Sequence, residues 1–255
     1  MTLVLTELSP FGIAMAADSA VTTTQVQTGL SYAVPNAAHK LQAIERLSAG
    51  VSCWGLGTIR GTPTDEWLCD FIRATEGVTT LGEFADELER RLNDEVGANP
   101  RGQPRLGFHV CRFEDYEGCP TPSFYHVHDG PSTALQARGT PVDPHRFNAN
   151  HDCPPQMCRA LFEDRQFYTT RNGDYQLYAG MFGLLGGFFA HLRELGIQIP
   201  SSQSLADRAE YLIFQIRVMC ELYRLSNLVP GIGGGIHFLT IASAGIHSRG
   251  VRYLW

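Results

Sequence analysis

The amino-terminal quarter of the chain consists of short apolar runs with alternating polar positions, a pattern typical of β-strands. Residues 3–8 and 11–18 predict one hairpin, and residues 40–44 and 50–54 predict a second. Both hairpins precede the first strong helix signal. The chain is therefore expected to begin with sheet structure.

Two helix signals follow these strands. Thr62 supplies a hydroxyl cap and Pro63 the first helical position, so a helix is expected to run to about residue 75. Thr80 and Glu83 form a capping box ahead of apolar positions at helical spacing, which predicts a second helix to about residue 96. Both helices are expected to cover one sheet.

The rest of the chain predicts further strands and helices. Strands are expected at 106–113 and 124–128, whereas residues 131–155 are rich in proline, asparagine and histidine and give no clear signal. Residues 178–192 carry no formal charge and are rich in glycine, but they are fewer than the ~20 residues that a bilayer requires. We therefore expect a buried core helix, which runs from about residue 180 to residue 195. A helix with a long apolar stripe is expected after the Ser204 cap, and strands are expected at 236–241 and 250–254.

Strands at both ends with helix pairs between them favour an α+β fold, specifically a four-layer αββα sandwich in which two sheets pack face to face under two helical layers. No linker divides the sequence. Residues 1–255 are therefore expected to form a single domain.

Composition narrows the functional classes. The net charge of -6 argues against a nucleic-acid partner, which requires a basic surface for phosphates. The seven cysteines are an odd set without a C-x-x-C pair, which indicates free thiols in a reducing compartment. The start of the chain lacks the basic and apolar regions of a signal peptide, so we expect a cytoplasmic protein without a membrane partner.

The second residue is the strongest candidate for chemistry. Thr2 is small enough for the initiator Met1 to be removed, and removal leaves one residue with both a hydroxyl and a free α-amine. An α-amine titrates at about 7.7–8.0, so near pH 7 a useful fraction is neutral and can accept the hydroxyl proton. Thr2 is therefore a candidate nucleophile that carries its own base.

Two charged residues stand at neighbouring strand ends. Asp18 ends the first predicted hairpin and Lys40 begins the second. A lysine beside the hydroxyl would lower its effective pKa, and a carboxylate would keep that ammonium charged and oriented. The sequence therefore predicts that Thr2, Asp18 and Lys40 converge at one rim of a sheet.

These residues resemble the β-type subunits of proteasomes, within the N-terminal nucleophile hydrolases. The matching residues are Thr2, Gly12–Ser19, Thr22, Lys40, Leu41 and Gly50–Gly57. The spacing from Thr2 to Asp18 is that of the family, whereas the segment between Asp18 and Lys40 is about six residues longer. The resemblance is close over roughly residues 2–57 and thin beyond them.

The resemblance implies a role for each matching residue. Thr2 is then the nucleophile, Asp18 and Lys40 the charge pair behind it, and the Gly55 N–H a donor to the oxyanion. Thr22 and Cys53 are expected beside the substrate cleft. No metal, nucleotide or other cofactor is needed.

The resemblance also implies partners. The chain is most similar to bacterial proteasome homologues that assemble from one subunit type, so copies of itself are expected in stacked rings around an inner chamber. The substrate class is then peptide or unfolded protein, admitted by a partner such as an ATP-dependent unfoldase. The expected activity is that of a threonine peptidase.

Two expected motifs are missing. The family has a Gly-Ser-Gly after a mid-chain strand, where this sequence reads Tyr178–Gly183, and an aspartate followed by Ser-Gly near the carboxyl end, where it reads Leu228–Gly235. Two alternatives therefore stay open. One is an inactive proteasome-like ring that serves as scaffold or binding chamber, and the other is a small-molecule amidohydrolase of the same superfamily.

Three further patterns have ordinary interpretations. His126 and His128 share one face of a strand, as zinc ligands can, but no third ligand is evident and a structural role is favoured. Cys153 and Cys158 are expected to be loop thiols. Gly231–Gly235 has no following Gly-Lys-Ser/Thr and is interpreted as a flexible turn before a core strand.

Overall fold

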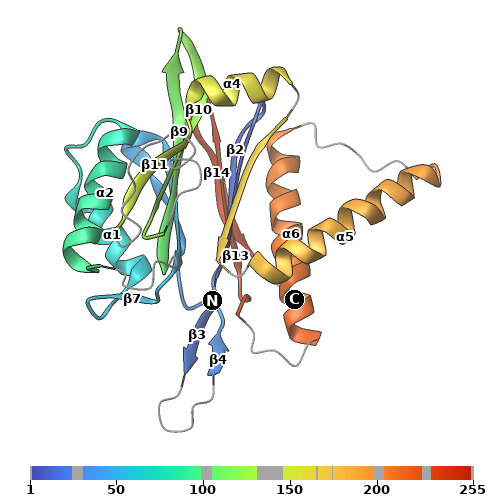
Figure 1. Cartoon of the computed structure of the whole chain (residues 1–255), viewed down its shortest axis with the longest axis horizontal. Coiled ribbons are helices and arrows are strands. Elements are labelled where there is room, and N and C mark those ends of the chain that lie inside the picture. Colours follow the sequence, from blue (N-terminus) through green and yellow to red (C-terminus); the bar gives the residue numbers. More distant parts are fainter. Residues whose placement is uncertain are drawn as a thin grey trace.

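A computed structural model describes residues 2–24, 31–98, 105–130, 146–164, 166–173, 175–197, 204–225 and 231–253. The architecture is α+β, with two five-stranded antiparallel sheets and helices on either side of them (Figure 1). The coarse fold class expected from the sequence is therefore confirmed.

The first sheet contains both ends of the chain. Its order is β12-β1-β2-β13-β14, with β1 Leu3–Ser9, β2 Gly12–Asp18, β12 Tyr168–Gly173, β13 Ile236–Ala242 and β14 Gly245–Arg252. Every residue of β1 and β2 is buried, so this hairpin lies at the centre of the molecule. The first predicted hairpin and the two carboxyl-terminal strands are confirmed, and β14 begins five residues earlier than expected.

The second sheet contains the middle of the chain. Its order is β11-β10-β9-β6-β5, with β5 Leu41–Ile44, β6 Ala49–Gly55, β9 Leu106–Tyr116, β10 Cys119–His128 and β11 Asn148–Cys153. A 3-10 turn, Glu45–Leu47, joins β5 to β6. The second predicted hairpin is confirmed, and β11 lies within residues 131–155, where no element was expected.

Short hairpins complete the sheet structure. β3 Val21–Thr24 pairs with β4 Ser31–Val34, and β7 Thr58–Ile59 pairs with β8 Thr62–Pro63. The β3–β4 hairpin extends beyond the sheets at the end of the molecule near the amino terminus (Figure 1).

Apolar faces hold the layers together. Between the two sheets, Ile13, Met15 and Leu239 share one core with Cys111 and Phe124. The first sheet also packs against α6 Leu205–Leu225, through the predicted stripe that includes Leu212, Ile216 and Met219. Since β1 and β2 are covered on both faces, their near-continuous apolar runs are explained.

Helices α1 Thr64–Ala74 and α2 Leu81–Glu95 cover the other face of the second sheet, as expected. The Thr80–Glu83 capping box is present. The predicted start of α1 is wrong by one residue, because Pro63 is the cap and has no side-chain capping bond.

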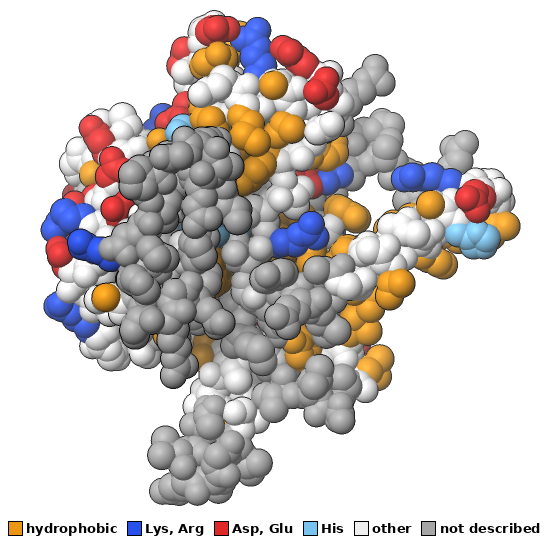
Figure 2. All heavy atoms as spheres, viewed as in Figure 1, with side chains coloured by type: hydrophobic (Ala, Val, Ile, Leu, Met, Phe, Trp, Pro, Cys, Tyr) orange, Lys and Arg blue, Asp and Glu red, His pale blue; other side chains and the backbone are white. Residues whose placement is uncertain are grey.

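Helix α5 Tyr175–Glu194 differs most from expectation. A helix is present, but the prediction that it is a buried core helix is wrong, because Leu184 is 73% exposed and Phe188 is 53% exposed. Near its start, Tyr178, Met181 and Phe182 contact the α6 core, and the rest projects from the body (Figures 1 and 2). Apolar composition indicates burial but does not specify the partner that provides it.

A further helix, α4 Pro155–Glu163, packs over the ends of β9 and β10 and was not predicted. Across the described residues, no helix is both long and apolar enough to cross a bilayer.

Candidate active site

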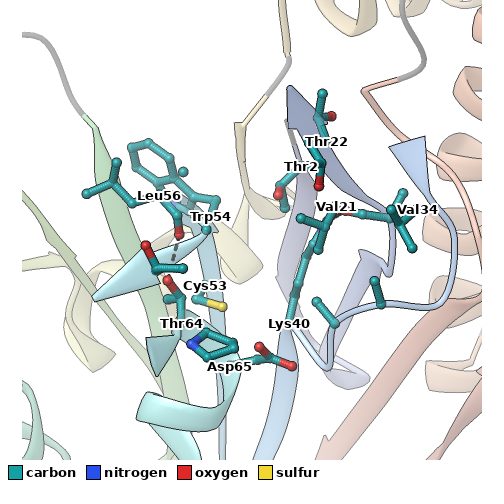
Figure 3. Close-up of a pocket in the computed structure, with 18 residues that line it drawn as sticks. Thr2, Val21, Thr22, Val34, Lys40, Cys53, Trp54, Leu56, Thr64 and Asp65 are labelled. Atoms are coloured by element: carbon teal, nitrogen blue, oxygen red, sulfur yellow. Dashed lines mark hydrogen bonds between the residues drawn. The ribbon is translucent and has the colours of Figure 1, made fainter. Parts of the chain in front are cut away.

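A pocket of about 300 Å³ opens where the amino terminus meets the ends of the second hairpin. Figure 3 shows Thr2, Val21, Val34 and Lys40 on one wall, with Trp54, Leu56 and Thr64 opposite. All six site residues expected from the sequence belong to this neighbourhood. Thr2, Thr22, Lys40, Cys53 and Gly55 line the pocket, and Asp18 lies behind Lys40.

Thr2 immediately precedes β1 and is 6% exposed. The next residue pairs with Gly173 at the end of β12, and a Cβ on Gly173 would overlap the carbonyl oxygen of Thr2. Gly173 also has φ of +101°, a conformation that other residues rarely adopt. Glycine at this position is therefore what allows β12 to approach Thr2 closely.

Asp18 ends β2 and is 1% exposed. Its Oδ1 accepts the Leu3 N–H at 2.9 Å, and its Oδ2 accepts the N–H groups of Ala20 at 3.1 Å and Gly233 at 3.2 Å. Lys40 Nζ donates to Oδ1 at 3.0 Å. A buried carboxylate is tolerated only when such donors compensate its lost hydration, so these four contacts hold the charge in place.

Lys40 directly precedes β5 and is 5% exposed. Its ammonium donates to Asp18 and to the backbone oxygen of Ala20. An ammonium has three N–H donors, and the described residues account for two of them. Within the part of the chain that the structure describes, the third donor has no partner, and Lys40 lines the pocket.

Gly55 ends β6 with φ of +101°, and a Cβ there would overlap the carbonyl oxygen of Arg105. Only glycine lets the backbone turn into the pocket at this point.

Cys53 also lines the pocket, but its thiol is a poor nucleophile. Burial, more than any neighbouring charge, raises the pKa of Cys53 to about 12. Because the thiolate is the reactive form, the Cys53 thiol is expected to be unreactive near pH 7.

The site contains backbone that the sequence analysis missed. The prediction that Tyr178–Gly183 corresponds to the family's Gly-Ser-Gly is wrong, because these residues lie within α5 and do not directly follow a strand. The strand that reaches Thr2 is β12, whose last residue is Gly173. Asp174, the next residue, lies outside the described residues.

The glycine-rich stretch before β13 does more than turn the chain. Gly233 N–H binds Asp18, and Gly233 oxygen accepts the N–H groups of Ser19 at 3.2 Å and Ala20 at 3.0 Å. Backbone groups of Gly233 therefore supply hydrogen bonds beside Asp18, where the resemblance implied an aspartate and a Ser-Gly pair. Residues 228–230 of the compared stretch lie outside the described residues.

The histidines considered as zinc ligands are buried between the sheets. His128 contacts the Gly130 N–H and Asn150, and the neighbouring His109 contacts Thr6 and Asn172. Burial lowers the pKa of His126 and of His128 to about 3. Among the described residues, no group of three or more histidine, cysteine or acidic side chains could hold a metal.

The prediction that Cys153 and Cys158 are loop thiols is wrong. Cys153 ends β11 and Cys158 lies in α4, with both side chains buried and their sulfurs 2.9 Å apart. They fill the core between the sheets.

No protein-family model matches the chain, and neither does any curated protein. Among solved structures, the chain is similar to the Anbu (Gly-1) mutant from Hyphomicrobium sp. strain MC1, with 13% identity, a TM-score of 0.51, and coverage of 99% of this chain and 87% of that one. It also matches Anbu (ancestral beta-subunit) from Yersinia bercovieri, with 12% identity, a TM-score of 0.49, and coverage of 98% and 87%.

The first likeness decides the fold. The chain has a proteasome-like fold. At 13% identity the similarity concerns the architecture alone and carries no information about activity.

Proposed function

We propose that this chain is a threonine peptidase subunit of a self-compartmentalising ring, built as a single αββα domain of the N-terminal nucleophile type. The observation that supports the proposal is the convergence of Thr2 with the buried Asp18–Lys40 pair at one pocket. A buried ion pair carries a large desolvation penalty, so two charged residues are not expected to lie buried behind the second residue of a chain by chance.

The reaction begins once Met1 has been removed. The Thr2 α-amine accepts the hydroxyl proton as Oγ1 attacks the substrate carbonyl, and the resulting oxyanion takes hydrogen bonds from the Gly55 N–H and Lys40. The amine then gives its proton to the leaving amine as the peptide bond breaks. Water attacks the acyl-enzyme in a second cycle of the same proton transfers and releases the acid.

Asp18 and Lys40 serve this reaction by position. Asp18 receives the Leu3 N–H and the Lys40 ammonium on the same oxygen, Oδ1. The carboxylate therefore ties the backbone beside Thr2 to the cation. Lys40 then presents positive charge where negative charge develops, without the need to reorganise in the transition state.

Self-assembly is supported by the exposed part of α5. Leu184, Phe188, Leu195 and Ile197 are each at least half exposed on or just after a helix that projects from the body (Figure 2). Exposed apolar patches of this kind mark interaction sites. We propose that copies of this chain cover the helix in stacked rings, with peptide or unfolded protein as substrate and an ATP-dependent unfoldase as a partner.

The test combines intact mass spectrometry with a threonine-directed electrophile. The purified protein is expected to lack Met1 and to gain one adduct on Thr2 from a peptide epoxyketone, which requires both the hydroxyl and the free amine. Thr2→Ala is expected to give no adduct, and Thr2→Ser is expected to retain labelling.

Other outcomes distinguish the alternatives. A protein that lacks Met1, forms rings and gives no adduct is a non-catalytic chamber. Labelling of a monomer or dimer favours the small-molecule amidohydrolase. Retained Met1 removes the proposed base and contradicts catalysis in that material.

A further inference from the structure

The pocket carries a second acidic group that the catalytic proposal does not use. Asp65 lies in the first turn of α1 and lines the same pocket as Thr2. Figure 3 shows its carboxylate at the opposite end of the pocket from Thr2, below Cys53 and Lys40 in this view.

Two hydrogen bonds hold Asp65 in place. Its Oδ2 accepts the His39 N–H at 2.8 Å, and its backbone oxygen accepts the Gln42 side chain at 2.7 Å. The positive end of the α1 dipole also favours an anion at this position. The carboxylate is therefore fixed before any ligand arrives.

Among the described residues, no cationic side chain pairs with this carboxylate. Within the described part of the chain, no side-chain nitrogen of a lysine, arginine or histidine comes within 4.0 Å of the Asp65 carboxylate. Lys40 is the other charged residue of the pocket lining, and its charge is matched by Asp18. Among the described residues, Asp65 therefore contributes a negative charge to the pocket that no cationic side chain matches.

The walls between the two ends suit a long aliphatic stem. Val21, Val34, Ala37 and Ala38 line the pocket together with Thr22. Lysine and arginine have such stems and bury them along apolar surface while the cationic head reaches a polar group.

We propose that Asp65 makes this pocket select peptides with lysine or arginine at the residue whose carbonyl Thr2 attacks. The inference rests on the proposed function of Thr2 for its catalytic consequence, whereas the charge preference of the pocket is a separate property. Arginine is the better ligand where both carboxylate oxygens are reached, because its planar guanidinium binds carboxylates in a bidentate manner.

The test compares fluorogenic peptides that differ only by arginine or citrulline before the scissile bond. Citrulline has the shape of arginine without its charge. The arginine peptide is expected to have a kcat/KM roughly tenfold higher, as expected for one additional charge contact in a partly exposed site. Equal values for the two peptides would overturn the inference while leaving the peptidase proposal intact.

Variants locate the preference. Asp65→Asn keeps an oxygen that can accept the His39 N–H and removes the charge. The ratio of kcat/KM for the arginine peptide to that for the citrulline peptide is therefore expected to fall close to one. Asp65→Glu is expected to keep much of the arginine preference. Asp70→Asn removes the same charge from an exposed position of the same helix and is expected to leave the preference unchanged.

Binding separates this inference from catalysis. In Thr2→Ala, the arginine and citrulline peptides as carboxamides are compared by isothermal titration calorimetry. Tighter binding of arginine that is lost in the Thr2→Ala, Asp65→Asn double variant supports the inference even if Thr2 proves inactive. Equal binding, or no binding of either peptide, contradicts it.

Discussion

Lys40 Nζ lies 3.0 Å from Asp18 Oδ1, and the two side chains are 6% and 0% exposed. Their charges are removed from water, so each depends on the other for compensation. The pair also binds the backbone on both sides of the site, at Leu3 and at Gly233. It therefore couples the stability of the fold to the position of Thr2.

Removal of one partner is expected to be costly. Lys40→Ala leaves the Asp18 carboxylate buried without its cation and is expected to lower the free energy of unfolding by roughly 3–5 kcal/mol in urea titrations. Arg73→Ala breaks an exposed pair with Asp70, whose side chains are 70% and 73% exposed, and is expected to cost at most about 1 kcal/mol. Similar losses in the two variants would contradict the proposed importance of the buried pair.

Gly173→Ala tests the close approach of β12 to Thr2. The new Cβ would overlap the Thr2 carbonyl oxygen and also meet an unfavourable φ, so we expect a loss of stability above the ~1–3 kcal/mol of backbone strain alone. Gly61→Ala is the matched control, because Gly61 has φ of +85° with nothing within 4 Å of an added Cβ. Thermal unfolding and epoxyketone labelling are measured on both variants. Equal effects would show that the contact with Thr2 is unimportant.

The sequence was sufficient to predict the two amino-terminal hairpins, the capping box of α2 and the gathering of Thr2 and Lys40 at one pocket. These features depend on local patterns and on motif residues at strand ends. Gly173 and Gly233 could not be found in this way, because they act through backbone groups that reach Thr2 and Asp18 from distant parts of the chain. The surroundings of α5 could not be predicted either, because an apolar helix face does not specify which partner covers it.

The buried histidines predict how stability depends on pH. Burial holds the pKa of His126 at about 3 in the folded protein, against about 6.5 in an unfolded chain. Between these values the unfolded state binds a proton that the folded state does not, so stability falls as pH drops below about 6.5. His126 alone is expected to remove roughly 2 kcal/mol between pH 6.5 and pH 5.

His126→Gln removes the titrating group and should flatten this slope, measured as the difference in unfolding free energy between pH 6.5 and pH 5. The comparison uses slopes because the substitution also changes stability at neutral pH. His109, His128 and Asp152 surround His126 and remain unchanged in the variant. His191→Gln is the control, since the His191 side chain is 64% exposed. A slope that His126→Gln leaves unchanged would assign the acid sensitivity to other groups.

Helix α5 provides the test of assembly. Leu184→Asp and Phe188→Asp place charges on side chains that are 73% and 53% exposed, so the subunit itself should still fold. A leucine-sized side chain contributes about 1.5–3 kcal/mol when buried, so each substitution is expected to weaken assembly roughly tenfold or more. Native mass spectrometry should then show a shift from rings toward monomers.

Met157→Asp on α4, where the side chain is 37% exposed, is expected to leave the rings intact. Rings that persist with unchanged stability in both α5 variants would mean that copies of the chain meet through another surface.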